Sequence, residues 1–274
     1  MERRVVITGM GAVTPLGGTL DQTWESLMKS LSGIDYISLF DASSFPVKIA
    51  AEVKSFDESK LMLPEELKPF TGRATKFCVA AAQEAIKHAG LNLEAIDDTM
   101  FGISLGGNEE TTKLSEFSNA FREENILHSL QNKDLSYFRD SNRLAQLWAI
   151  RRCAHTTSNI LSILFNARGP VSTSSTACAS SAQAIGKAMR MIEHADADIM
   201  ITGGCDSIIS EFSVAGFGLL GALSNHNNDP QRASRPFDLK RDGFVLGEGS
   251  GILVLEELSH ARARGARILA EITG

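Results

Sequence analysis

One cysteine of this chain lies in a segment whose residue types fit nucleophilic chemistry. Cys178 is surrounded by small residues in the run STSSTACASS at positions 172–181. A strand is predicted at 171–175 and a helix at about 179–194, so the cysteine falls where a strand turns into a helix. The first amides of a helix lack internal partners, and the helix dipole places partial positive charge on them. Because this charge stabilises a thiolate, Cys178 is our candidate nucleophile.

The small neighbours of the cysteine would serve the same chemistry. Ala177 and the residues at 179–181 leave room for a long thioester substrate and let backbone amides approach a developing oxyanion. The pattern resembles the nucleophile elbow of hydrolases, with sulfur in place of oxygen. A buried, unreactive cysteine in a turn of small residues fits the same pattern, so position and composition leave both interpretations open.

The other cysteines and an early glycine pair carry weaker signals. Cys78, Cys153 and Cys205 form no CxxC pair and no Cys/His spacing typical of a metal site, so we expect no metal and free thiols in a reducing compartment. Cys78 lies on the apolar stripe of a predicted helix and is expected in the core. The GMG sequence at 9–11 follows a strand, but the third glycine and the acidic residue of a dinucleotide loop are missing.

Strand and helix patterns alternate along the chain. Buried strands are predicted at 3–8, 47–53, 99–105, 171–175, 198–203, 251–256 and 267–272. Helices are predicted from apolar periodicity at 20–31, 73–89, 156–166, 179–194 and 258–264. Gly90 ends the second of these helices, and Thr19 or Asp21 caps the first. The alternation predicts an α/β fold with a parallel sheet that is covered on both faces.

Composition and charge exclude several classes of protein. The chain has 274 residues, of which 43% are hydrophobic and 22% charged, values typical of an ordered globular protein. The formal net charge is −6 and no basic stripe carries interleaved aromatics, so nucleic-acid binding is disfavoured. No apolar run reaches the roughly 18 residues of a membrane span, and the apolar run near the N-terminus is too short for a signal peptide. We therefore expect a cytoplasmic protein.

Several motifs, in order and at matching spacing, resemble the β-ketoacyl-ACP synthase family, of the type that elongates acyl chains. They are RRVVITGMGAVTPLG at 3–17, ARGPVSTSSTACASS at 167–181, ADIMITGGCDS at 197–207 and the long segment from Gly216 to Gly274. The resemblance covers nearly the whole chain. It implies a thiolase-like, layered α-β-α-β-α fold, a homodimer, and a mostly parallel mixed sheet in an N-terminal domain formed by residues 1–274.

The resemblance also assigns roles to single residues. The family's active-site cysteine falls on Cys178, an aromatic residue of the acyl tunnel on Phe217, and a small residue of that tunnel on Ser213. Leu105 matches a residue at the far end of the tunnel, near the dimer partner. Ala177 completes the set of expected substrate-binding residues. Ordinary core packing is the alternative for the pocket residues.

The reaction that the resemblance implies is a decarboxylative Claisen condensation. Cys178 takes an acyl group from acyl carrier protein, malonyl-carrier loses carbon dioxide, and the enolate attacks the acyl thioester to give a 3-oxoacyl product. The backbone N–H of Cys178 would be one oxyanion donor. The resemblance implies no metal or redox cofactor, because decarboxylation makes the carbanion.

The chain departs from the family in two respects. The family's catalytic histidines and lysine lie in a C-terminal half, whereas this chain stops at Gly274 inside a predicted strand. We therefore expect a truncated N-terminal half that exposes a large apolar face and aggregates or forms non-native dimers. None of the six histidines lies in a catalytic motif, although His155 stands where the family often has asparagine. The stretch at 108–157, which includes Trp148, is longer than usual and indicates a specialised branch.

Alternatives from two classes stay open. A biosynthetic thiolase shares the fold and a cysteine nucleophile, but RPFDLKRDGF at 235–244 argues against it. A non-catalytic partner subunit resembles a synthase but lacks the cysteine, so Cys178 argues against that role for the parent protein. The chain taken alone still fits an interaction module, since the family's acid and base groups are outside it. The basic run at 262–267 would contact an acidic carrier protein or form a solvated helix face.

Overall fold

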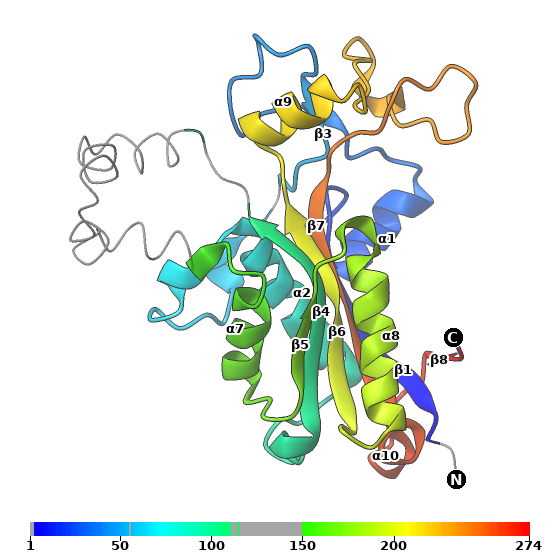
Figure 1. Cartoon of the computed structure of the whole chain (residues 1–274). Helices are drawn as coiled ribbons and strands as arrows, with labels where there is room; N and C mark the ends of the chain where they lie inside the picture. Colours follow the sequence, from blue (N-terminus) through cyan, green and yellow to red (C-terminus); the bar gives the residue numbers. More distant parts are fainter. Residues whose placement is uncertain (1–2, 55, 111–113, 115–149) are drawn as a thin grey trace, which may run out of the picture.

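Six strands form the central sheet of the computed structural model, which describes residues 3–54, 56–110, 114 and 150–274 (Figure 1). The strands are β1 (Val5–Val13), β4 (Phe101–Glu110), β5 (Val171–Ser174), β6 (Ile199–Ser207), β7 (Glu248–Glu257) and β8 (Ala270–Ile272). Their order in space is β5-β4-β6-β7-β1-β8. A separate two-stranded sheet consists of β2 (Asp35–Tyr36) and β3 (Ile49–Ala50).

The central sheet is mixed, and most of its strands point the same way. β4 runs parallel to β5 and β6, whereas β7 runs antiparallel to β6 and β1. β8 is antiparallel to β1. β5, β4, β6 and β1 therefore share one direction, which confirms the predicted mostly parallel mixed sheet. β7 runs the other way because it starts at the end of the sheet at which β6 stops, after the long connection between them.

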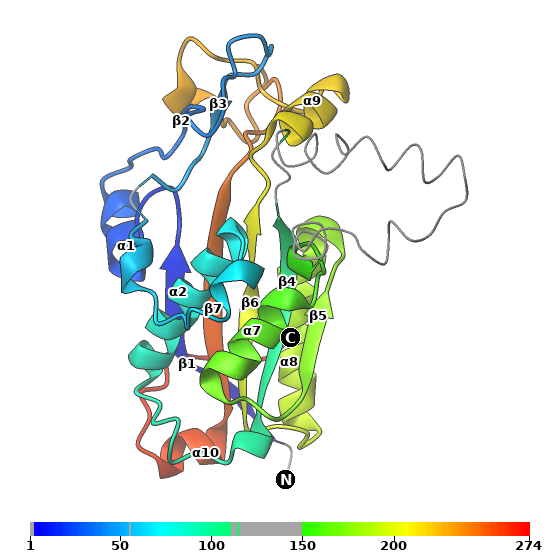
Figure 2. The ribbon, with the colours of Figure 1, turned by 90° about the vertical axis from the view of Figure 1, so that its left-hand side faces the viewer.

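Helices cover both faces of the sheet, as the alternating pattern predicts (Figures 1 and 2). The α-helices of the described residues are α1 (Leu20–Met28), α2 (Arg73–Ala89), α7 (Thr156–Phe165), α8 (Ser180–Glu193), α9 (Glu211–Leu219) and α10 (Leu258–Ala263). α2 and α7 pack on one face of the sheet, and α8 packs on the other. Among the described residues, no helix is long and apolar enough to span a membrane.

The two faces of the sheet carry separate apolar cores. On one face Phe77 and Cys78 of α2 pack with Leu161 of α7 and with sheet residues. Cys78 is fully buried there, which confirms its predicted place in the core. On the other face Ile192 of α8 packs with Met200 of β6. These cores hold α8, and with it the segment that carries Cys178, firmly on the sheet.

The glycines at 9–11 lie inside β1 and bring this strand against α2. A Cβ at Gly9 would collide with the backbone carbonyl of Ala85, and a Cβ at Gly11 with that of Ala81. β1 includes both glycines and continues to Val13, beyond the strand end predicted at residue 8. Because both glycines sit in a strand and serve helix packing, they form no phosphate-binding loop.

Local signals place most helix ends correctly. Thr19 caps α1 and accepts a hydrogen bond of 3.2 Å from an amide of the first turn. Gly90 ends α2 with a φ of +60°, as predicted from sequence. α1 ends at Met28 rather than at 31, and Ser30 behind it has a φ of +52°. The strand predicted at 47–53 is reduced to β3.

A smaller region stands above one end of the sheet and contains β2, β3, α9 and the loops that follow α9 (Figure 1). Its own apolar core includes Val47, Ile49 and Val214. The sequence patterns assign no element to α9, because Gly216 and Gly218 lower the helix propensity of that segment. The helix forms nevertheless, with a serine cap at its start and an apolar side packed on this core.

Candidate active site at the start of helix α8

Cys178 lies at the junction of β5 and α8, as predicted. Residues Ala177–Ala179 form a single 3-10 turn between them, and α8 begins at Ser180. The cysteine is exposed in this chain, not buried as the alternative interpretation of this turn expects. The turn follows the carboxyl end of a parallel strand, the end of an α/β sheet where ligands bind. An exposed thiol at this place is open to a substrate.

The residue before Cys178 has an unusual backbone conformation. Ala177 has a φ of +51°, in the left-handed region that a residue with a Cβ rarely adopts. This conformation costs about 1–2 kcal/mol, and such strain is often found at functional sites. The left-handed residue lies where the chain passes from β5 to α8, directly before Cys178.

Two glycines let the sheet come very close to the first turn of α8. A Cβ at Gly106, in β4, would collide with the backbone of Ser180 and Ser181. A Cβ at Gly204, in β6, would collide with the side-chain hydroxyl of Ser181. The positive end of the helix is therefore seated directly over the carboxyl ends of β4 and β6.

Hydroxyl groups under α8 fix the helix to the sheet. Ser104 of β4 donates a hydrogen bond of 3.0 Å from Oγ to the carbonyl of Ala184. Ser172 of β5 donates to Ser104 Oγ, also at 3.0 Å. At the start of the helix, the hydroxyl of Ser180 links backbone groups of Thr176 and Ala177. Cys178, the candidate nucleophile, thus lies beside an element that is firmly held, as precise chemistry requires.

The predicted pocket residues lie in different surroundings. Phe217 and Ser213 are in α9, which stands above the end of the sheet at which α8 begins (Figure 1). Phe217 is half-buried and meets the ring of Phe244 edge-on, with centroids 5.6 Å apart. The backbone N–H of Ser213 donates to the cap of α9 at 3.2 Å. Leu105 is 1% exposed and packs in the core beside α2 and α7.

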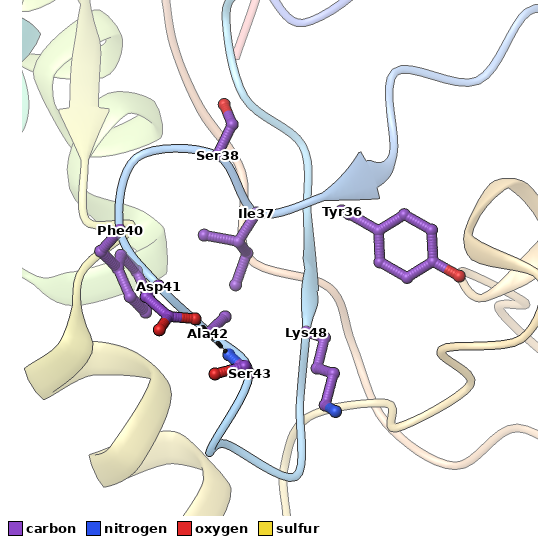
Figure 3. Close-up of a pocket in the computed structure, with 8 residues that line it drawn as sticks. All are labelled: Tyr36, Ile37, Ser38, Phe40, Asp41, Ala42, Ser43 and Lys48. Atoms are coloured by element: carbon purple, nitrogen blue, oxygen red, sulfur yellow. Dashed lines mark hydrogen bonds between the residues drawn. The ribbon is translucent and has the colours of Figure 1, made fainter.

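Two pockets lie in the region above the sheet. One, of about 430 Å³, is lined by residues 36–38, 40–43 and Lys48, with Lys48 opposite the loop that carries Asp41 and Ser43 (Figure 3). The N–H and hydroxyl of Ser43 lower the pKa of the Asp41 carboxyl. A second pocket, of about 510 Å³, is lined by residues that include Arg235 and Phe244. Cys178 lines neither of these two pockets.

A buried carboxylate joins several elements at the same end of the sheet. Glu248 begins β7, and its side chain is fully buried. It accepts hydrogen bonds from Arg73, from the hydroxyl of Ser207 at 2.8 Å and from the N–H of Val53 at 2.8 Å. Glu248 is not among the residues predicted from the sequence. The available signal is a single charged residue in the glycine-rich segment just before the strand predicted at 251–256.

Two of the described histidines make side-chain contacts of a structural kind. His88 of α2 accepts a hydrogen bond of 3.3 Å from the N–H of Met10. His260 lies 2.9 Å from Glu256 through Nδ1. His155 stands at the start of α7 and makes no capping bond with its side chain. The departure predicted around Trp148 lies outside the described residues, as does His128.

The comparisons with known proteins agree with the geometry. Residues 2–261 match the family model described as "Beta-ketoacyl synthase, N-terminal domain". The 3-oxoacyl-[acyl-carrier-protein] synthase 2 of Synechocystis sp. is 39% identical over 273 residues, which cover 100% of this chain and 62% of the relative. The chain therefore spans less than two thirds of the length of this relative.

Solved structures of ketosynthases have the same fold. A β-ketoacyl synthase from Burkholderia phymatum STM815 has a TM-score of 0.83 and 34% identity, over 100% of this chain and 64% of that chain. A type II polyketide-synthase acyl-carrier protein in complex with its ketosynthase gives a TM-score of 0.74 and 28% identity, over 100% and 62%. The predicted α/β, thiolase-like fold is confirmed, and the chain belongs to the β-ketoacyl synthase family, whose N-terminal domain it matches.

Proposed function

We propose that the protein is a 3-oxoacyl-[acyl-carrier-protein] synthase of fatty-acid or polyketide synthesis, with Cys178 as its nucleophile. The observation that carries the proposal is the exposed thiol of Cys178 on a strained turn between β5 and α8. Membership of the family supports the reaction class, and the geometry supports Cys178 as the nucleophile. The alternative of a thiolase is not supported by the family match.

The proposed reaction begins with acyl transfer. The Cys178 thiol loses its proton, and the thiolate attacks the carbonyl carbon of an acyl-carrier thioester to form a new C–S bond. The C–S bond to the carrier breaks, and the carrier leaves as a thiolate that takes up the proton released by Cys178. The N–H of Cys178 is our candidate oxyanion donor, because it belongs to the turn over the positive end of α8. No metal or redox cofactor enters this scheme.

Condensation follows acyl transfer. Malonyl-carrier loses carbon dioxide, and the electrons of the broken C–C bond remain in an enolate. The enolate carbon attacks the acyl-cysteine carbonyl, a new C–C bond forms, and the Cys178 thiolate leaves to give 3-oxoacyl-carrier. The histidines and lysine that the family uses for this step lie outside the segment that this chain matches, so we propose that a second half supplies them.

Four residues are proposed to contact the acyl chain. Ala177 borders the nucleophile, and Phe217 and Ser213 of α9 lie above the same end of the sheet. Leu105 is our candidate for the far end of the acyl site. Its burial fits a wall residue and fits core packing equally well.

We propose that residues 1–274 form one domain of a longer synthase. Large apolar side chains are exposed in the described part of the chain, among them Trp24 at 62%, Leu219 at 90% and Phe237 at 99%. Exposed apolar side chains in this number support a covering partner. A second half of the synthase fits that role, since the curated relative is longer than this chain.

Four further properties belong to the proposal. β5 is an edge strand with Val171 40% exposed, so two copies of the chain would form a homodimer by pairing this edge. Acyl carrier protein is the proposed partner, as for the ketosynthase solved with its carrier. The basic run at 262–267 begins in the last turn of α10, at the opposite end of the sheet from the start of α8 (Figure 1), which favours a solvated face. Four free cysteines fit a reducing, cytoplasmic compartment.

Acylation of the protein tests this function directly. The purified protein is incubated with an acyl thioester at neutral pH, and the added mass is located by peptide mass spectrometry. We expect the acyl group on Cys178, none on Cys78, Cys153 or Cys205, and none in a Cys178→Ala variant. A folded protein whose Cys178 stays unlabelled, even with a second half of a synthase added, would favour the non-catalytic interaction module.

A further inference from the structure

A buried hydroxyl lies directly behind the exposed nucleophile. Ser180 is only 3% exposed, whereas residues 175–179 before it are exposed. Its Oγ accepts a hydrogen bond of 2.8 Å from the N–H of Thr176 and donates one of 2.7 Å to the carbonyl of Ala177. The single proton of the hydroxyl and one lone pair are both used. Ser180 follows Cys178 in the sequence, and its hydroxyl is therefore hydrogen-bonded to the two residues that precede the cysteine, Thr176 and Ala177.

These hydrogen bonds differ from those of an ordinary helix cap. A capping serine accepts from the second or third amide of the helix that it starts. The capping position of α8 is Ala179, which makes no side-chain hydrogen bond. The hydroxyl of Ser180 points back to residues that precede the cysteine. It serves the turn and not the helix.

The turn needs such a restraint because of its backbone strain. Ala177 has a φ of +51°, and a residue with a side chain keeps such a conformation only where its surroundings enforce it. Two backbone hydrogen bonds also restrain the turn: the Ala179 N–H donates to the Thr176 carbonyl at 3.2 Å, and the Ser180 N–H donates to the Ala177 carbonyl. The Ser180 hydroxyl holds the carbonyl of Ala177, the strained residue itself.

We propose that Ser180 is a positioning residue for Cys178, and that its hydroxyl holds the turn in the shape that exposes the thiol and seats it over the positive end of α8. Ser180 acts through the cysteine and touches no substrate. The proposal deepens the proposed function, since positioning matters only if Cys178 is the nucleophile.

Alkylation of the thiol tests the proposal without any acyl substrate. The rate at which iodoacetamide labels Cys178 is measured by peptide mass spectrometry in the purified protein and in three variants, Ser180→Ala, Ser180→Thr and Ser162→Ala. Cys153 is also exposed, and its labelling in the same sample is an internal control for reagent and solvent. Thermal unfolding of each variant reports whether it is folded.

Ser162 is a matched control. Its hydroxyl also donates a hydrogen bond of 2.7 Å to a backbone carbonyl, that of Ala167, but it lies at the end of α7. Ser162→Ala removes a comparable bond and leaves the turn of Cys178 unchanged. Ser180→Thr keeps the hydroxyl and tests whether this group is the cause.

The expected result is a fall of roughly fivefold to tenfold in the Cys178 alkylation rate of Ser180→Ala, because the thiol leaves the positive end of the helix. Ser180→Thr and Ser162→Ala should keep the rate within about twofold, and Cys153 should react equally in all four proteins. A folded Ser180→Ala protein with the original Cys178 rate would overturn the proposal. So would an equal fall in Ser180→Thr or in Ser162→Ala.

The proposed function can fail separately. If Cys178 shows the expected dependence on Ser180 but is never acylated by a thioester, the positioning role stands and the synthase function does not. If Cys178 is acylated and its alkylation rate is the same in Ser180→Ala as in the original protein, the function stands and the positioning role does not.

Discussion

Arg73 and Glu248 are 175 residues apart in the sequence and form a two-pronged ion pair. Arg73 Nε lies 2.8 Å from Glu248 Oε2, and Arg73 Nη2 lies 2.6 Å from Oε1. The pair fastens the start of α2 to the start of β7, at the end of the sheet where α8 begins. Because the Glu248 side chain is fully buried, it depends on Arg73 for its counter-charge.

Replacing Arg73 should therefore destabilise the protein. Lysine keeps the charge but cannot make the two-pronged contact with Glu248. It also loses the hydrogen bond that Arg73 donates to the Val53 carbonyl. We expect Arg73→Lys to lower the free energy of unfolding by about 2 kcal/mol, measured by urea denaturation. Arg4→Lys is the matched control, because the Arg4–Glu271 pair is also close but largely exposed. An Arg4→Lys loss as large as that of Arg73→Lys would contradict this account.

The close approach of β4 to α8 makes a second prediction. Gly106→Ala places a Cβ against the backbone of Ser180 and should lower the free energy of unfolding by about 2–3 kcal/mol while slowing alkylation of Cys178. Gly186→Ala is the control, since a Cβ there meets nothing within 4 Å. This control should gain about 0.5–1 kcal/mol from better helix propensity. Equal effects of the two variants would show that packing at Gly106 is not the cause.

Acid stability should depend on Glu256. Burial raises the pKa of its carboxyl, but hydrogen bonds from Arg264, Thr8 and His260 outweigh burial, and the pKa lies below its ordinary value. A lowered pKa stabilises the folded protein above the ordinary glutamate pKa of about 4.3, and this contribution is lost as the pH falls through the lowered value.

The measurement is the free energy of unfolding between neutral pH and about pH 3. Glu256→Gln should be less stable than the original protein by about 2–3 kcal/mol near neutral pH, because Arg264 loses its charged acceptor. The difference between the two proteins should shrink as the pH falls. A difference that stays constant across this range would contradict the role of the Glu256 charge.

Phe217 should influence which acyl chains reach Cys178. We expect Phe217→Leu to change the relative acylation rates with short and long acyl thioesters by about threefold to tenfold, since it reshapes the proposed acyl site. Phe45→Leu is the matched control. Phe45 makes a similar edge-on contact with Phe40 in the same region, at 5.7 Å. If both variants alter the preference equally, the cause is loosening of the region and not a contact of Phe217 with substrate.

The exposed edge of the sheet should control association. A lysine on an edge strand opposes pairing with another strand, so Val171→Lys should shift the proposed dimer toward monomer. Light scattering coupled to size exclusion measures the change. Ile163→Lys, on the exposed side of α7, is the control and should leave the mass unchanged. A dimer that persists in Val171→Lys would exclude pairing through β5.

Much of the fold and the candidate nucleophile follow from short stretches of sequence. Gly90 ends α2, Thr19 caps α1, and the strand–cysteine–helix pattern around Cys178 appears in the structure within about a residue. These features depend on backbone preferences and apolar periodicity, which act over a few residues and are therefore visible in the sequence alone.

The tertiary structure decided what depends on residues far apart in the chain. Gly9 and Gly11 proved to be packing sites against α2, Leu105 proved to face the core, and Arg73 found Glu248 across 175 positions. The close seat of α8 on β4 and β6, at Gly106 and Gly204, also depends on residues far apart in the chain. Local sequence sets the turn and the helix, but the sheet, through close backbone contacts, determines the shape in which Cys178 is presented.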